Sequence, residues 1–313
     1  MCNYGYGKAP DADKLMHELF QVLNGCGNEI ETILLGASGS FLDENEIPEA
    51  LQNRILQAVF QRKIPQIIIE THYKSISDAI LRRIAEQLPN RSIELEVGLE
   101  TADSWIGTHI LNKRINLTEF EMMIAVAHRY GMSVTVNLLL GMPFFTEAAQ
   151  LADTKNSIRW ALSKNVDYII VFPLNIHPYT LFEWLYQNGC LQPPSLWLAV
   201  QLLSELNDFE LNHVSMAWYG NRSVDYGAGQ VSVLPKTCDA CRDVLLSFFE
   251  VFYATRNLGE RKKQIEELLR TNFPCNCREK VFQKLSTAPE FLSSEYQAAR
   301  HKIEGLVSQY EHT

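Results

Sequence analysis

Five short apolar runs alternate with amphipathic stretches between residues 30 and 175, and this alternation constrains the fold more than any other feature. The runs cover residues 32–36, 66–70, 93–99, 134–140 and 168–172. They are rich in β-branched residues and leucine with little polar alternation, which is typical of parallel strands covered on both faces. Helical patterns lie between them, at 47–62, 77–87, 117–130 and 147–164. The repetition predicts βαβ units and an α/β fold with a parallel sheet, either closed towards a barrel or doubly wound.

The pattern changes after residue 172. Pro193 and Pro194 interrupt the chain, residues 196–211 predict one more helix, and residues 216–233 are rich in glycine and tyrosine. A helical tail that carries cysteines follows. We therefore predict a boundary near residue 215, with one α/β domain over residues 1–215 and a small, mainly helical C-terminal domain over residues 216–313.

Charge and hydropathy narrow the class of protein. The formal net charge is −9 and the pI is about 5.4, so the chain needs a local basic patch or a more basic partner to hold a polyanion. No run approaches the roughly 18 apolar residues of a membrane span, and the first residues lack the apolar core of a signal peptide. The sequence predicts a cytoplasmic protein with no membrane partner.

The cysteines indicate a metal site near the C-terminus. The chain has seven cysteines, an odd number without an export signal, so a disulfide framework is not expected. Cys238 and Cys241 form a C-x2-C pair, and Cys275 and Cys277 form a C-x-C pair. Four thiolates in two pairs suit a structural, tetrahedral zinc ion or, less often, an accessory iron–sulfur cluster. The alternative is four free cysteines on helices.

Polar and small residues gather where the predicted strands end, which is where barrel enzymes place their chemistry. Acids end the second and third strands, and small or turn-forming residues follow the others. These residues are Ser38, Gly39 and Ser40 after the first strand, Glu70 and Glu100 after the next two, Asn137 and Gly141 around the end of the fourth, and Pro173 after the fifth.

The order of five phrases, SGSFLD, GLET, LNK, LLLGMP and PLNIHPYT, resembles the radical S-adenosylmethionine (SAM) superfamily. The resemblance covers roughly residues 2–210. It is to the group that includes the catalytic subunit of elongator, and in particular to the radical SAM subunits of archaeosine synthases. It implies a partial (β/α)6 TIM-like barrel whose first strand lies upstream of residue 1. It also implies a [4Fe–4S] cluster and reductive cleavage of SAM to a 5′-deoxyadenosyl radical. The substrate class that it implies is a modified nucleobase, and in the archaeosine group this is a lysine-adducted deazaguanine in tRNA.

The resemblance assigns roles to individual residues. Cys2 corresponds to the last cysteine of the C-x3-C-x2-C cluster motif, with Tyr4 as the nearest aromatic residue. The other cofactor-binding residues are predicted by the family phrases or by their strand-end positions. They are Ser38, Gly39 and Ser40 at the SAM amino group, Glu100 at SAM, Lys113 at the SAM carboxylate, Asn137 and Gly141 beside the adenine and ribose, and Glu70 and Pro173 at the rim.

The implied partners are an electron donor and a protein that presents tRNA or the nucleobase. Since Cys2 is the one cysteine of the cluster motif in the sequence, two further readings stay open. The chain is either a degenerate radical SAM fold without a cluster, serving as a binding or scaffold subunit, or a truncated reading frame that begins inside the motif. The presence of the other SAM-binding phrases favours truncation.

Overall fold

The computed structural model describes residues 11–26, 30–36, 39–217, 233–235, 237–286 and 292–310. Of the predicted site residues, Cys2, Tyr4 and Ser38 lie outside these ranges, so their assigned roles stay predictions. Among the described residues, no helix combines the length and apolar character that a membrane crossing requires.

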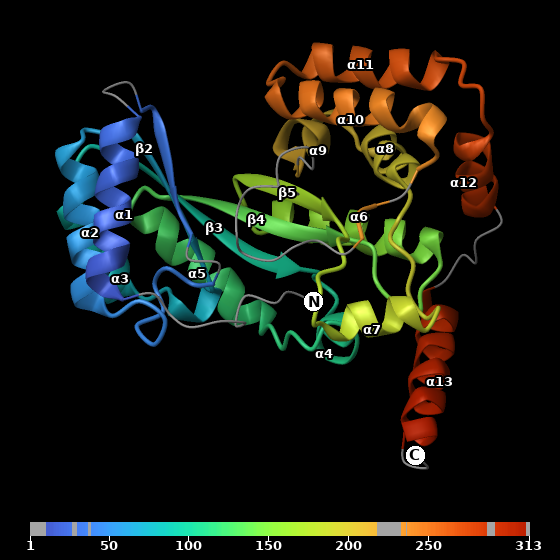
Figure 1. Cartoon of the computed structure of the whole chain (residues 1–313), viewed down its shortest axis with the longest axis horizontal. Coiled ribbons are helices and arrows are strands. Elements are labelled where there is room, and N and C mark those ends of the chain that lie inside the picture. Colours follow the sequence, from blue (N-terminus) through green and yellow to red (C-terminus); the bar gives the residue numbers. More distant parts are fainter. Residues whose placement is uncertain are drawn as a thin grey trace.

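A curved sheet of six parallel strands forms the centre of the molecule, with the strands in sequence order from β1 to β6 (Figure 1). Its strands are β1 (Thr32–Leu35), β2 (Gln66–Thr71), β3 (Ser92–Glu100), β4 (Ser133–Leu140), β5 (Tyr168–Pro173) and β6 (Val214–Met216). The first five confirm the predicted strands to within two residues at each end. The sixth was missed because three residues are too few to show a periodicity.

Helices cover one face of the sheet. Four of them confirm the predicted helical patterns to within two residues: α2 (Glu49–Gln61), α3 (Asp78–Gln87), α5 (Leu117–Arg129) and α6 (Glu147–Ser163). Their apolar stripes meet alternate strand residues in one core cluster. It includes Leu56, Val59, Leu81, Ile84, Phe120 and Ile158 from the helices and Ile67, Leu95, Val97 and Val136 from the strands, all at most 1% exposed. Burial of each such side chain contributes about 1.5–3 kcal/mol. α1 (Ala12–Gly25) packs against α2 on the outside.

The predicted helix over 196–211 is in fact two helices, α8 (Leu196–Glu205) and α9 (Asp208–His213). Asn207 starts the second one. Its side chain accepts a hydrogen bond from the Glu210 backbone N–H at 2.9 Å, and the Glu210 carboxylate accepts one from the Asn207 N–H at 2.9 Å. This reciprocal capping box separates the two helices and turns the chain into β6.

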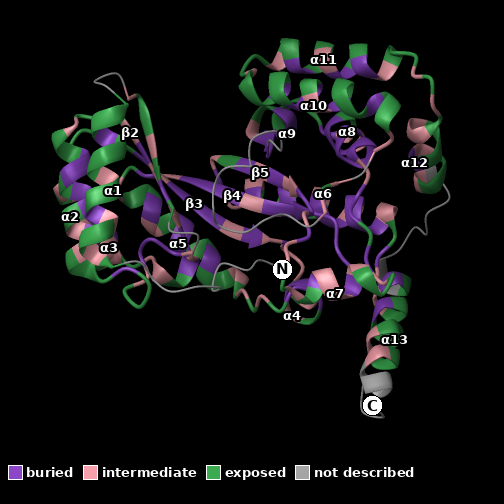
Figure 2. Ribbon diagram, viewed as in Figure 1, coloured by how far each residue is buried: buried purple, intermediate pink, exposed green. Residues whose placement is uncertain are grey.

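The C-terminal helices share the core of the sheet. α10 (Asp239–Ala254) and α11 (Leu258–Arg270) stack on α8 and α9, while α12 (Cys277–Ser286) follows at the outer edge (Figure 1). Arg261 of α11 is 1% exposed, and its Nη1 donates to the backbone oxygens of Leu211 and Val214, each at 2.9 Å. The buried guanidinium donates hydrogen bonds to these backbone carbonyl groups at β6, and it thereby holds α11 against the edge of the sheet. Figure 2 shows buried residues continuing from the strands into α8 and α10. The domain boundary near residue 215 stays a prediction.

Candidate functional site

One face of β3 and β4 carries polar side chains, while the other face lies in the core. Glu96 and Gly98 alternate along β3 with the buried Leu95 and Val97, as a period of two requires. In the register of the sheet, Gly98 pairs with Asn137 of β4. The Asn137 Nδ2 donates to the Glu96 Oε1 at 2.8 Å, and the Asn137 Oδ1 is buried without a hydrogen-bond partner among the described residues. An unused buried acceptor is costly unless a ligand or water meets it.

Glu100 ends β3 in a strained conformation. The register slips between Gly98 and Glu100, and Glu100 has a φ of +67°, which L residues seldom adopt. The Lys113 Nζ donates to the Glu100 Oε1 at 2.8 Å, and the two side chains are 26% and 14% exposed. A Cβ on Gly98 would lie 2.8 Å from both of these atoms. The structure therefore brings two predicted residues together, and a side chain at position 98 would displace the ends of this pair.

Glu70 lies at the end of the neighbouring strand β2, beside the loop that follows β1. A Cβ on Gly36 would collide with the Glu70 Oε2, so the glycine makes room for this carboxylate. In the same loop, Gly39 faces Glu46, whose Oε2 would collide with a Cβ at that position. Glycines at both points let the loop pass close to carboxylates at the end of the sheet.

The Ser40 hydroxyl belongs to a buried network beneath this loop. Its Oγ lies 2.8 Å from the Thr71 Oγ1, donates to the Ser75 Oγ at 3.1 Å and accepts from the His72 N–H at 3.0 Å. The Ser40 backbone N–H donates to the Glu46 Oε2 at 2.7 Å. Ser40 thus has a role within the chain, because it ties the loop after β1 to the end of β2. Its contact with SAM stays a prediction.

Gly141 and Pro173 lie at the ends of β4 and β5. Leu140 pairs with Pro173 in the sheet, and the chain then turns at Gly141 with a φ of +115°. A Cβ at Gly141 would lie 2.9 Å from the Leu174 Cβ. Close packing accounts for the glycine, and its proximity to the adenine and ribose of SAM stays a prediction.

A buried acid near this end of the sheet escaped the sequence analysis. Asp153 of α6 is 2% exposed, and its Oδ1 accepts from the Thr101 Oγ1 at 2.9 Å. Burial raises the pKa of the Asp153 carboxyl to about 7; the Thr101 hydrogen bond opposes this shift and Asp103 adds to it. The sequence offered no signal for this pair, since the two residues are 52 positions apart.

The helix α13 (Leu292–Tyr310) packs across the loops at the carboxyl end of the sheet. The Glu295 carboxylate accepts from the Thr146 N–H and hydroxyl at 3.3 and 3.0 Å. The Tyr296 hydroxyl donates to the Asp103 Oδ2. Burial, reinforced by Asp103, raises the Tyr296 pKa well above its ordinary value, so Tyr296 remains a hydrogen-bond donor at neutral pH.

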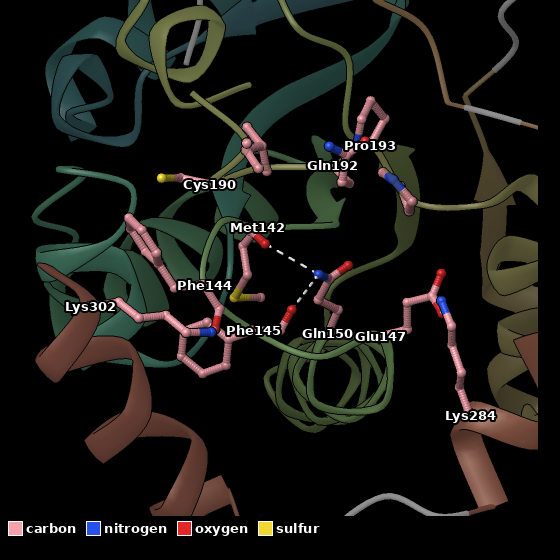
Figure 3. A pocket seen from close by; sticks show the side chains of 13 residues that line it. Met142, Phe144, Phe145, Glu147, Gln150, Cys190, Gln192, Pro193, Lys284 and Lys302 are labelled. Atoms are coloured by element: carbon pink, nitrogen blue, oxygen red, sulfur yellow. Dashed lines mark hydrogen bonds and ion pairs between the residues drawn. The ribbon is translucent and has the colours of Figure 1, made fainter. Parts of the chain in front are cut away.

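A cavity of about 240 Å³ lies where α12 and α13 meet the loop after β4 (Figure 3). The Gln150 Nε2 donates to the backbone oxygens of Met142 and Phe145 at 3.2 and 3.0 Å and holds that loop in place. At the cavity wall, the Lys284 Nζ of α12 lies 3.1 Å from the Glu147 Oε2 (Figure 3). Residues from two C-terminal helices therefore complete a cavity beside the strand ends.

The two predicted cysteine pairs converge. The sulfur atoms of Cys238, Cys241, Cys275 and Cys277 all lie within 4.8 Å of one another. Hydrogen bonds with the other three thiols, that with Cys277 foremost, lower the pKa of Cys238 to about 6. The clustering that the spacing predicted is confirmed, and the group could hold a metal ion.

Among known proteins, a solved structure resembles the fold of this chain. No protein-family model matches the chain. In a superposition on Elp3 from Methanocaldococcus infernus, lacking its N-terminal segment, the TM-score is 0.53 at 16% identity, over 74% of this chain and 57% of that one. The predicted class, an α/β fold similar to the TIM-like barrels of radical SAM proteins with a helical, cysteine-bearing C-terminal region, is confirmed.

Two curated relatives resemble this chain in sequence. The chain is 27% identical over 296 residues to the archaeosine synthase subunit beta of Methanosarcina acetivorans, covering 93% of this chain and 80% of the relative. It is 30% identical over 170 residues to the subunit of the same name from Thermococcus kodakarensis, covering 53% of this chain and 51% of that relative. The predicted resemblance to the radical SAM group around archaeosine synthase is confirmed.

Proposed function

We propose that this chain is a radical SAM enzyme subunit of the archaeosine synthase type, which acts on a modified nucleobase in tRNA. One observation carries the proposal: the strained Glu100 and its partner Lys113 lie at the end of β3, next to the strand whose buried Asn137 Oδ1 has no hydrogen-bond partner within the described part of the chain. Strain that persists at a strand end is typical of ligand sites. The names of the two curated relatives support the substrate class.

The charges at this end of the sheet fit SAM. Glu70, Glu96 and Glu100 place carboxylates on neighbouring strands β2 and β3, and carboxylates attract the sulfonium and ammonium groups of SAM. Lys113 uses one N–H for Glu100, so its other N–H groups are positioned to donate to a carboxylate. The Asn137 Oδ1 accepts a hydrogen bond from a ligand hydroxyl or amine. These residues bind and orient SAM in the proposed complex.

When bound, the [4Fe–4S] cluster and SAM supply one-electron chemistry that ends in abstraction of a hydrogen atom from the substrate. Cys2 is the residue of this sequence that we expect to bind the cluster. Glycines at positions 36, 39 and 98 leave room for ligand and carboxylates at the rim. An electron donor must reduce the cluster.

A partner subunit holds the tRNA in this proposal. The net charge of −9 opposes binding of a polyanion by this chain alone. The curated relatives are themselves named as subunits, which supports an assembly of more than one chain.

Calorimetric titration with SAM under anaerobic conditions tests the binding site. Glu100→Gln removes the charge next to Lys113, and we expect the Kd for SAM to rise at least about tenfold, or 1.4 kcal/mol. The matched control is Glu121→Gln, because Glu121 pairs with Lys164 at 2.9 Å on the outer helices, away from the strand ends. Equal affinity in wild type and Glu100→Gln would place SAM elsewhere.

Reconstitution with iron, sulfide and dithionite tests the activity in protein that carries all three cysteines of the C-x3-C-x2-C motif, of which this sequence holds Cys2. We expect 5′-deoxyadenosine to form from SAM, and the rate to fall in Glu100→Gln but not in Glu121→Gln. Tight SAM binding without any 5′-deoxyadenosine would contradict the enzymatic proposal and favour a binding or scaffold subunit.

A further inference from the structure

Four thiols from two remote segments surround one point beside the core. Cys238 precedes α10 and Cys241 lies in its first turn, while Cys275 and Cys277 flank the start of α12. Cys241 is fully buried, and the other three are half-buried. All four sulfur atoms lie within 4.8 Å of one another. Four sulfur atoms gathered this closely from two segments can all bind a single metal ion.

The distances distinguish among the partners that four thiols can have. The Cys238 and Cys241 sulfurs are 3.5 Å apart, which is far longer than the roughly 2.05 Å of a disulfide. In a tetrahedral site with zinc–sulfur bonds of about 2.3 Å, neighbouring sulfurs are about 3.8 Å apart. In a cubane cluster each thiolate binds a different iron on the outside of the cluster, which separates the thiolates to about 6 Å. An upper limit of 4.8 Å fits a single metal ion and is too short for the cluster.

The surroundings of the site suit a negatively charged centre. Four thiolates around a divalent ion leave two net negative charges. The N-termini of the long helices α10 and α12 meet here, and helix N-termini stabilise negative charge. Cys238 occupies the N-cap of α10, where its side chain makes no cap hydrogen bond and is left to bind a metal.

The cysteines hold together segments that also contact the barrel helices. The stretch between α11 and α12 carries Phe273, whose ring meets Trp197 of α8 edge-on at 5.1 Å. At the start of α12, the Arg278 Nη1 donates to the Leu269 oxygen of α11 at 2.6 Å. Further along α12, Lys284 reaches Glu147 at the cavity wall (Figure 3). A metal ion bound by both cysteine pairs therefore fixes the position of α12.

We propose that one tetrahedral zinc ion is bound by Cys238, Cys241, Cys275 and Cys277. The ion fastens α12 to α10, and it thereby fixes the position of Lys284, which lines the cavity. The role is structural, because four thiolates leave no open coordination position for a substrate. Zinc suits an all-sulfur tetrahedral site and undergoes no redox change. The site is separate from the strand-end residues proposed to bind SAM.

Metal analysis of the purified full chain tests the proposal without SAM or reconstitution. We expect about one zinc per chain, with X-ray absorption showing four sulfur neighbours at about 2.3 Å. Cys238→Ser and Cys275→Ser should each lose most of the zinc. Cys26→Ser and Cys190→Ser are matched controls outside the cluster and should keep it. Zinc retained by Cys275→Ser, or iron and sulfide bound at these cysteines, would overturn the assignment.

Two measurements on the wild-type protein test the proposal even if the serine variants fail to fold. Replacement of the bound ion by Co²⁺ should give the intense visible absorption of a tetrahedral thiolate site. Removal of the metal by a chelator should raise amide hydrogen exchange in α12 by at least about tenfold, while β2 and β3 stay protected. A purified wild-type chain without stoichiometric zinc or cobalt uptake, or unchanged exchange in α12 after metal removal, would contradict the proposal.

Discussion

Replacement of the buried Asp153 by asparagine should stabilise the protein at neutral and alkaline pH. Burial raises the pKa of this carboxyl from its ordinary value of 3.8 to about 7, so the unfolded chain releases the proton at a lower pH than the folded one. A shift of about three pKa units corresponds to about 4 kcal/mol. The free energy of unfolding therefore falls as the pH rises from about 4, and the loss is complete above about pH 7.

Asp153→Asn keeps the acceptor for the Thr101 hydroxyl and abolishes the titration. The remaining cost of burying the amide is the same at every pH. We expect the difference in unfolding free energy, variant minus wild type, to rise by about 3 kcal/mol between pH 5 and pH 8. Urea unfolding followed by tryptophan fluorescence at several pH values measures this difference.

The control is Asp13→Asn in α1, because the Asp13 side chain is 86% exposed and pairs with Arg54 at the surface. Its difference from wild type should change little between pH 5 and pH 8. If the difference in unfolding free energy between Asp153→Asn and wild type also stays constant from pH 5 to pH 8, burial does not raise the pKa of Asp153 in the folded protein. The reasoning from burial would then be wrong.

Two further substitutions test the packing around the strand ends. Gly141→Ala should cost about 2–4 kcal/mol of stability in urea unfolding, because it adds a contact of 2.9 Å to Leu174 to the strain of a φ of +115°. The control is Gly131→Ala, because Gly131 has a φ of +69° and no atom lies within 4 Å of the new Cβ. This substitution should cost only about 1 kcal/mol. Equal losses of stability in the two variants would show that the contact with Leu174 contributes nothing. Tyr296→Phe removes a hydrogen bond to the Asp103 carboxylate and should weaken the docking of α13 by about 1.5–3 kcal/mol, seen as faster amide exchange in that helix. Unchanged exchange in α13 would show that apolar packing alone holds it.

The sequence by itself determined the five long strands and the helices between them. Each strand is rich in β-branched residues and leucine because one of its faces packs in the core, and a local pattern of this kind needs no knowledge of distant residues. The pattern predicted strands covered on both faces, whereas the side chains of β2, β3 and β5 alternate between buried and partly exposed. The sequence also placed Glu70 and Glu100 at strand ends, because parallel strands end at the same edge of a sheet, whereas Asn137 lies within β4. The spacing of the cysteines by itself predicted a metal site.

Tertiary structure decided how remote residues meet. The approach of Cys238 to Cys275 depends on how α10, α11 and α12 pack, and the contact of Thr101 with Asp153 depends on how α6 packs against β4, the neighbour of β3. Such contacts join residues tens of positions apart, and no local period encodes them. The bulge that strains Glu100 and sets it beside Lys113 is of the same kind, because it arises from the register between β3 and β4. The sequence alone thus specifies which residues reach the end of the sheet, and packing specifies which of them touch.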